Sequence, residues 1–135
     1  MALQFSTAVR NARLDAIESA IGASAILKIR SGAAPATCAT ADAGSVLATL
    51  ALPADWMAAA ASGQKAMSGA WADNSADNTG SAGHFRIYAN DGTTCHAQGT
   101  VTLTGGGGDM TVDNPAFQQG QSFSITSFTI NEPNG

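Results

Sequence analysis

The first part of the sequence, residues 1–37, contains a stretch with the pattern of an amphipathic helix. Ser6 or Thr7 can serve as the N-cap, because a hydroxyl oxygen there accepts an early backbone N–H. Three aliphatic residues recur at the spacing of one helix face: Leu14, Ile17 and Ile21. Gly22 follows where a helix C-cap favours glycine. The sequence therefore predicts a helix over about residues 7–21 that covers an open end or face of a β-fold, with docking on another subunit as the alternative.

The remainder of the chain is typical of short strands separated by polar turns. Apolar residues alternate or cluster over residues 24–30, 45–52, 64–71, 81–89, 93–104, 109–113 and 121–131. Asn90-Asp91-Gly92 predicts a type I′ hairpin between two of these strands. In the last strand the apolar residues change from odd to even positions at Thr126-Ser127. This change of parity predicts a bulge or a switch between sheets. Gly99 is a second candidate for a bulge.

Residues 54–63 are ambiguous, because an alanine run with high helix propensity lies between strand-like segments. We interpret them as a loop that carries a helical turn, with Trp56 and Met57 as anchors. One helix and about six to eight strands then predict a mainly β fold, an antiparallel β-sandwich or jelly-roll-like domain with an N-terminal helix. At 135 residues a single domain spanning 1–135 is expected, with the sandwich over about residues 24–131.

The charge of the chain is low and uneven. Charged residues make up 12% of the sequence, and the net charge is −4. Bases predominate up to Arg30 and acids afterwards, so a basic N-terminal part joined to an acidic remainder could orient the molecule on a charged partner surface; scattered solvated charges are the alternative. The acidic balance argues against nucleic-acid binding.

No apolar run approaches the roughly 20 residues that span a bilayer, and no secretory signal is recognisable, so synthesis in a cytoplasm and no membrane partner are expected.

The two cysteines are Cys38 and Cys95. In a reducing compartment such a pair is expected to be free and buried rather than bridged. A disulfide becomes possible where the segments that carry them meet.

Two groups of residues have a partial resemblance to metal sites. The segment Asp73–Asn78 is rich in Asp and Asn, but it has Asn78 where a calcium loop needs glycine, so a solvated turn is favoured. His84 and His96 could be cross-strand neighbours in the predicted hairpin, and Cys95 is adjacent to His96. Two ligands are too few for a structural zinc site, and successive strand residues point to opposite faces. We therefore predict no metal site.

No catalytic pattern is recognisable. The tract Gly105–Gly108 lacks the following Lys-Ser/Thr and the helix of a phosphate loop. No strand–turn–helix nucleophile motif is present, and histidines and charged residues are sparse. The sequence predicts a protein that is not an enzyme and has no catalytic residue and no cofactor.

Three segments carry a resemblance to a known family: residues 1–37, 74–99 and 122–135. Together they resemble small virion structural proteins of tailed bacteriophages. The positions that match the family pattern are Arg10, Asn11, Leu14 and Asp15 in the helix, Ser31-Gly32 after the first strand, and Pro35-Ala36. The sequence departs from the family at Cys38, Cys95 and the alanine run 58–61. The resemblance rests on residues that set the fold.

The resemblance implies a head decoration (cement) protein on the capsid surface of the virion, or a tail-associated protein. As a cement protein the chain would bind the major capsid protein and copies of itself and bridge capsid subunits. We expect the contacts from Leu3, Phe5, Arg10 and Arg13 and from the loop anchors Trp56 and Trp71. The alternative is a tail or baseplate component, or a receptor- or carbohydrate-binding module in which exposed Trp56, Trp71 and Tyr88 provide stacking surfaces.

Overall fold

The computed structural model describes residues 3–134, and it begins with the helix that the sequence predicts. Helix α1 spans Thr7–Ile21, and the hydroxyl of its N-cap Ser6 accepts a hydrogen bond from the Val9 N–H at 3.3 Å. Gly22 ends the helix at φ 97°, and its N–H donates to the Glu18 carbonyl. Leu14 and Ile21 are buried. The predicted boundaries of the helix are thus confirmed.

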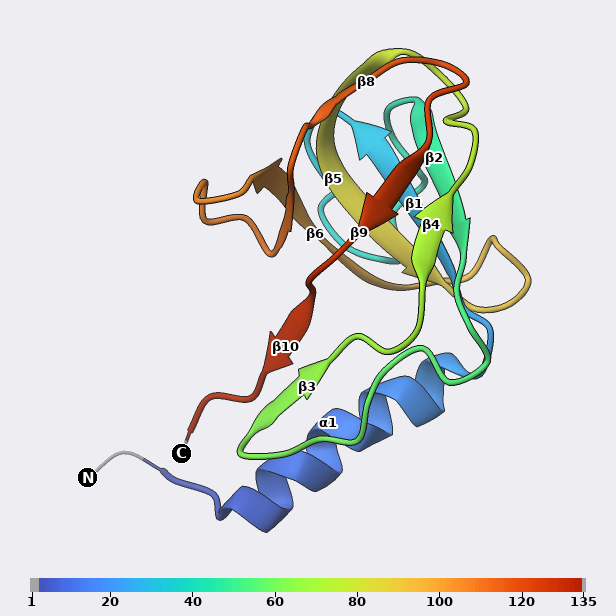
Figure 1. Cartoon of the computed structure of the whole chain (residues 1–135). Helices are drawn as coiled ribbons and strands as arrows, with labels where there is room; N and C mark the ends of the chain where they lie inside the picture. The colour runs from blue at the N-terminus through green and yellow to red at the C-terminus, as the bar shows by residue number, and fades with distance from the viewer. Residues whose placement is uncertain (1–2, 135) are drawn as a thin grey trace.

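A six-stranded sheet forms the main layer of the fold (Figure 1). Its path runs β2-β1-β5-β6-β7, and β8 pairs with the start of β5. The strands are β1 (Ile26–Ser31), β2 (Val46–Ala51), β5 (Gly80–Tyr88), β6 (Cys95–Leu103), β7 (Met110–Val112) and β8 (Ala116–Phe117). All pairings are antiparallel except that of β6 with β7.

Two short strand pairs complete the β-structure. They are β4 (Trp71–Asp73) with β9 (Phe123–Ile125), and β3 (Gln64–Ala66) with β10 (Thr129–Asn131). In Figure 1 the β4–β9 pair lies in front of the main sheet, and β3 and β10 lie towards α1. The chain therefore changes sheets between β9 and β10, which confirms the switch that the parity slip predicts. The mainly β, sandwich-like fold with an N-terminal helix is also confirmed.

One apolar cluster fills the space between the main sheet and the short strand pairs. Its centre is aromatic: the ring centroids of Trp56 and Trp71 are 6.0 Å apart, and Phe128 lies 5.7 Å from both Trp71 and Phe85. Gly99 adjoins this cluster, because a Cβ atom there would lie 2.8 Å from the Phe85 ring. Gly99 therefore makes room for an aromatic ring and is not the bulge that its sequence position suggested.

The helical turn expected within residues 54–63 is wrong. Residues Met57 and Ala61 instead form antiparallel bridges with Met67 and Gln64. Backbone N–H groups of this extended segment donate to side chains on α1: Met57 to Glu18, Ala60 to Asp15, and Gly63 to Asn11. These tertiary hydrogen bonds outweigh the helix propensity of the alanine run.

The β5–β6 hairpin is confirmed, but its turn is longer than type I′. The Ala89 N–H donates to the Thr94 carbonyl, and the Asp91 side chain accepts from the Thr93 and Thr94 N–H groups. Beyond the turn, Tyr88 faces Cys95 while Ile87 faces Ala97, so the register shifts at His96. Simple alternation along the strand would place Cys95 and Ala97 on the same face, but the shift places them on opposite faces.

The same register separates the two histidines. His84 faces Thr100 across the β5–β6 pair. The expected cross-strand pairing of His84 with His96 is therefore wrong, because His96 lies near the turn, at the register shift between the partners of Ile87 and Tyr88.

Candidate functional site

Polar side chains collect on the face of the main sheet that lies opposite the aromatic cluster. Lys28, Arg86 and Gln98 are aligned across β1, β5 and β6, and Arg30 faces His84. The loop over residues 32–45 covers this face. Arg86 and His84 are 2% and 0% exposed, so the loop encloses the polar face almost as completely as the core is enclosed.

Arg86 is the centre of these contacts. Its Nη1 donates to Asp42 Oδ1 at 2.7 Å, and its Nη2 donates to the carbonyls of Thr37 and Thr40 at 2.9 and 3.0 Å. Its Nε and Nη2 also donate to Gln98 Oε1. Five hydrogen bonds therefore tie one side chain on β5 to the loop and to β6, a geometry that the planar guanidinium allows.

Asp42 is the acidic partner in this network. Its Oδ1 also accepts from the Tyr88 hydroxyl at 2.7 Å, and its Oδ2 accepts from Arg30 Nη2 at 3.0 Å. Desolvation acts to raise the pKa of Asp42, but the hydrogen bonds from Tyr88 and Arg86 and the charge of Arg30 prevail and lower it. Burial and the bond to Asp42 raise the pKa of the Tyr88 hydroxyl. Asp42 is therefore held as a carboxylate that fixes the loop.

At the other end of the molecule, Lys65 is another buried charged side chain that holds two segments of the chain together. It is 2% exposed, and its Nζ contacts Asp15 Oδ1 at 2.7 Å, Glu18 Oε1 at 3.0 Å and the Ala58 carbonyl at 2.8 Å. Desolvation opposes the charge of Lys65, but the bonds to Asp15 and Glu18 raise its pKa overall. Lys65 thereby attaches α1 to the β3 hairpin.

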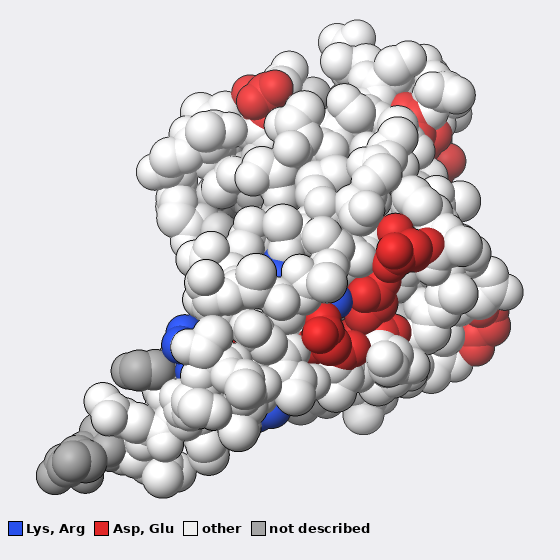
Figure 2. Space-filling model, turned by 60° about the horizontal axis from the view of Figure 1, so that its bottom comes forward, with Lys and Arg blue, Asp and Glu red and all other residues white. Residues whose placement is uncertain are grey.

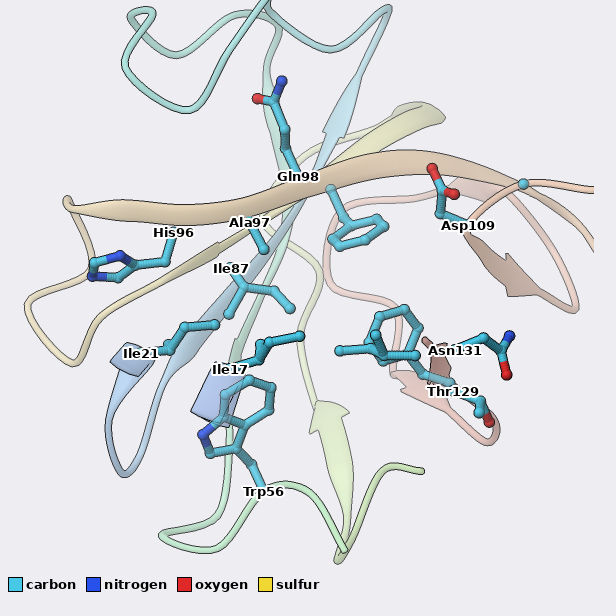
Figure 3. A pocket seen from close by; sticks show the side chains of 14 residues that line it. Ile17, Ile21, Trp56, Ile87, His96, Ala97, Gln98, Asp109, Thr129 and Asn131 are labelled. Carbon is cyan, nitrogen blue, oxygen red and sulfur yellow. The ribbon is translucent and has the colours of Figure 1, made fainter. Parts of the chain in front are cut away.

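A groove of about 630 Å³ lies between α1, β6 and β10. Apolar side chains line it, among them Ile17, Ile21, Ile87 and Phe128. Figure 3 shows His96 at one end and Asp109 and Asn131 at the other, while the side chain of Gln98 points to the opposite face of β6.

The polar groups of the groove do not meet at one point. Asp109 is occupied by the N–H and the hydroxyl of Thr100, and His96 lies at the far end. The groove can accommodate apolar groups, and this arrangement does not pair an acid with a base.

The predicted contact residues divide into two groups. Phe5, Arg10 and Arg13 lie together where the two ends of the described chain meet, and Leu3 comes two residues before Phe5. The Phe5 N–H donates to the Asn134 carbonyl, the Arg13 guanidinium lies 5.2 Å from the Phe5 ring centroid, and Arg13 pairs with Glu132 at 3.1 Å. Arg10 donates to the Glu132 carbonyl. Leu3 is 71% exposed, so an exposed apolar side chain lies two residues before Phe5, whose ring contacts the Arg13 guanidinium.

Trp56 and Trp71 do not join that surface. They are 0% and 1% exposed, and their indole N–H groups donate to the carbonyls of Gly22 and Trp56 respectively. The expectation that they contact a partner is corrected, because the change of sheets between β9 and β10 brings Phe128 against Trp71 and encloses both rings. Tyr88 is also fully buried.

The Asp73–Asn78 segment supports the free edge of β2. The Thr49 N–H donates to Asp73 Oδ2, the Asp77 N–H donates to the Leu47 carbonyl, and the Asn78 amide donates to the Val46 carbonyl. Among residues 3–134, no group of three or more His, Cys, Asp or Glu side chains is placed to hold a metal ion. The segment therefore occupies backbone groups at the free edge of β2, which limits strand pairing with other chains.

The surface has few exposed cations. Of the six Lys and Arg residues, Arg30, Lys65 and Arg86 are buried. Figure 2 accordingly shows a mostly uncharged face on which a band of acidic atoms outweighs the visible basic atoms. Of the four bases in the N-terminal part only Arg30 is buried, whereas both bases of the acidic remainder, Lys65 and Arg86, are buried, so the surface keeps the uneven charge that the sequence indicates.

The comparisons with known proteins identify no relative. The chain matches no protein-family model, no curated protein and no solved structure. Within the described part of the chain, no helix is long and apolar enough to cross a membrane. The resemblance to phage virion proteins stays a prediction.

The network around Arg86 was missed by sequence reasoning. The sequence did contain a signal. In the predicted strands, Lys28, Arg30, His84 and Arg86 alternate with apolar residues, so they all point to the face of the sheet away from the apolar core. Half-exposed antiparallel strands ordinarily present such residues to water. Nothing local indicated that the loop containing Asp42 folds back over them.

Proposed function

We propose that this protein is a structural component of a tailed-phage virion, a decoration protein that binds the assembled head and bridges major capsid subunits. The observation that carries the proposal is that the buried basic side chains all bind other segments of the same chain. Arg30, Lys65 and Arg86 each bind a loop or helix of the same chain. These groups build a rigid body with a sparsely charged surface, which suits a protein that acts by packing against neighbours.

The contact with the head is assigned to the end of the molecule formed by Leu3, Phe5, Arg10 and Arg13. Leu3 offers an exposed apolar group, and Glu132 holds Arg10 and Arg13 in place. Side chains that are already ordered lose little entropy on binding. A ligand that binds only the assembled shell stabilises it by RT ln(1 + [L]/Kd) at every site, and this is the proposed mechanism.

A tail or baseplate component is the alternative. Its carbohydrate-binding form depends on exposed aromatic faces for stacking, and the burial of Trp56, Trp71 and Tyr88 weighs against it. The copy number per virion separates the two locations, because a decoration protein is present in hundreds of copies and a tail ring protein in a few.

The test is binding of the purified protein to phage heads assembled without it, measured by co-sedimentation and by the temperature at which the heads release DNA. Two exposed leucines supply a matched pair, since Leu3 is 71% and Leu103 is 53% exposed. We expect Leu3→Ser to weaken binding at least about tenfold, which corresponds to about 1.4 kcal/mol, and Leu103→Ser to bind as the wild type does. Absence of wild-type binding to heads would contradict the proposal, and an equal effect of both substitutions would contradict the assigned surface.

A further inference from the structure

Cys38 and Cys95 are far apart in the sequence and are brought together by the polar face of the main sheet. Cys38 lies in the turn Thr37–Thr40, where the Thr40 N–H donates to the Thr37 carbonyl. The carbonyls of Thr37 and Thr40 also accept hydrogen bonds from Arg86 Nη2. The loop is thereby fixed above β5 at the position of Cys38.

Cys95 reaches the same place from β6. The register shift at His96 sets Cys95 opposite Tyr88, on the face that carries Arg86. Cys38 lies near enough to Cys95 to raise the pKa of its thiol, whereas the charge of Arg86 acts to lower it. Both cysteines are free thiols, and both are partly exposed, so a small reagent can reach the pair.

We propose that Cys38 and Cys95 form a redox pair that closes to an intramolecular disulfide when a low-molecular-weight disulfide such as glutathione disulfide is present. The fold places both cysteines on the Arg86 face of the sheet before any oxidation, so closure leaves the pairing of β5 with β6 intact. The bond would attach the covering loop to β6 covalently, beside the hydrogen bonds of Arg86. This inference is independent of the function proposed above.

The exchange proceeds in two steps. The thiolate of Cys38 attacks one sulfur of glutathione disulfide, the S–S bond breaks, and one glutathione leaves as a thiolate. The thiolate of Cys95 then attacks the Cys38 sulfur of the mixed disulfide and releases the second glutathione. The two cysteines lose two protons and two electrons, and two glutathione thiols are formed.

The order of attack follows from the surroundings of Cys95. Burial, the bond with Cys38 and the charge of Cys38 raise the pKa of the Cys95 thiol to about 11, although the charge of Arg86 and a hydrogen bond with the Ala97 backbone act in the other direction. A thiol that is rarely ionised near neutral pH is a poor first nucleophile. Cys95 is therefore the resolving residue, which acts once Cys38 carries the mixed disulfide within its reach.

The experiment incubates the full chain with glutathione disulfide near pH 8, quenches with acid, digests without reduction and identifies the cross-linked peptides by mass spectrometry. We expect a Cys38–Cys95 peptide as the main product, together with a rise in Tm of roughly 5–15 °C that dithiothreitol reverses. Separate glutathione adducts on the two cysteines, a disulfide between two molecules, or two unreacted thiols would each overturn the proposal.

Single variants test the order of attack. In Cys95→Ser we expect a stable mixed disulfide on Cys38. In Cys38→Ser we expect Cys95 to react more slowly than Cys38 does in Cys95→Ser, since burial still raises the pKa of the Cys95 thiol when Cys38 is absent. Equal rates in the two variants would overturn the assigned order, and the cross-link in the wild type tests the pair itself without any substitution.

Discussion

The two faces of the main sheet are both buried, but by different means. On one face Leu27, Ile87 and Phe85 pack into the aromatic cluster. On the other face Arg86 and Tyr88 are equally enclosed, and one loop holds both through hydrogen bonds. The first face is buried by non-directional contacts with several elements, whereas the second depends on a small set of hydrogen bonds with fixed geometry.

This difference predicts two kinds of failure. Loss of an apolar side chain removes transfer free energy and leaves a cavity, so the damage scales with the volume lost. Loss of one member of a buried polar network leaves its partners unsatisfied, so the damage exceeds the value of one bond. Substitutions on the two faces should therefore differ in where the structure opens as well as in magnitude.

Trp56→Ala should give the largest effect. Trp56 is fully buried between Trp71 and the groove, and its indole N–H donates to the Gly22 carbonyl at 2.9 Å. Truncation of a buried aromatic residue costs about 3–5 kcal/mol. We expect the urea midpoint to fall with an unchanged m-value, as for a small single domain that unfolds in one cooperative transition.

Trp56→Phe is the control for that prediction, because it keeps most of the ring and removes the N–H group. A loss of about 1–2 kcal/mol is expected from the unpaired Gly22 carbonyl and the smaller ring. Equal losses in the two variants would show that the hydrogen bond, and not apolar packing, dominates at this position.

Arg86→Met should destabilise the fold by about 2–3 kcal/mol, because it removes the donor of the Gln98 Oε1 and Thr40 carbonyl oxygens and one of the two guanidinium partners of Asp42. The local effect is more diagnostic than the global one. Hydrogen exchange should accelerate over residues 35–42 while β1 and the apolar face stay protected. Uniform acceleration across the sheet would contradict the distinction between the faces.

The double variant Arg86→Met with Gln98→Leu sharpens this test. It removes both partners of the Arg86–Gln98 bonds, so less should be lost than the sum of the two single substitutions. Simple additivity would indicate that the two side chains act independently.

The parts of the fold that the sequence predicts are those set by local patterns. The helix depends on Ser6, the spacing of Leu14 and Ile21, and Gly22, all within one segment, and its ends are as expected. The sheet switch was visible because Phe123 and Phe128 have opposite parity. In these cases the responsible residues are close in the sequence.

The parts that were missed depend on distant residues. The alanine run at 58–61 is extended because α1 supplies Asp15 and Glu18 as acceptors. Trp56 and Trp71 looked like surface anchors, since an aromatic residue beside a turn has the same local pattern whether it is buried or exposed. Asp42 lies in a loop of small residues, and its role appears once Arg30 and Arg86 are placed beneath it.

Asp42→Asn should give the smallest effect on stability and the clearest dependence on pH. The folded state lowers the pKa of Asp42 below its usual 3.8. A group with a depressed folded pKa contributes stability that is complete above the unfolded pKa and is lost as pH falls through the folded value. The carboxyl is partly exposed, so screening limits the expected loss in the variant to about 1 kcal/mol at pH 7.

The measurement is the difference in Tm between wild type and Asp42→Asn across a pH series. The difference should be constant from about pH 7 to pH 5 and should shrink below about pH 4, because protonation of Asp42 then removes the same charge from the wild type. Asp113→Asn, at an exposed position, is the control for a general effect of removing a carboxylate. A difference that persists undiminished at low pH would mean that the geometry of the side chain, and not its charge, holds the loop over the polar face.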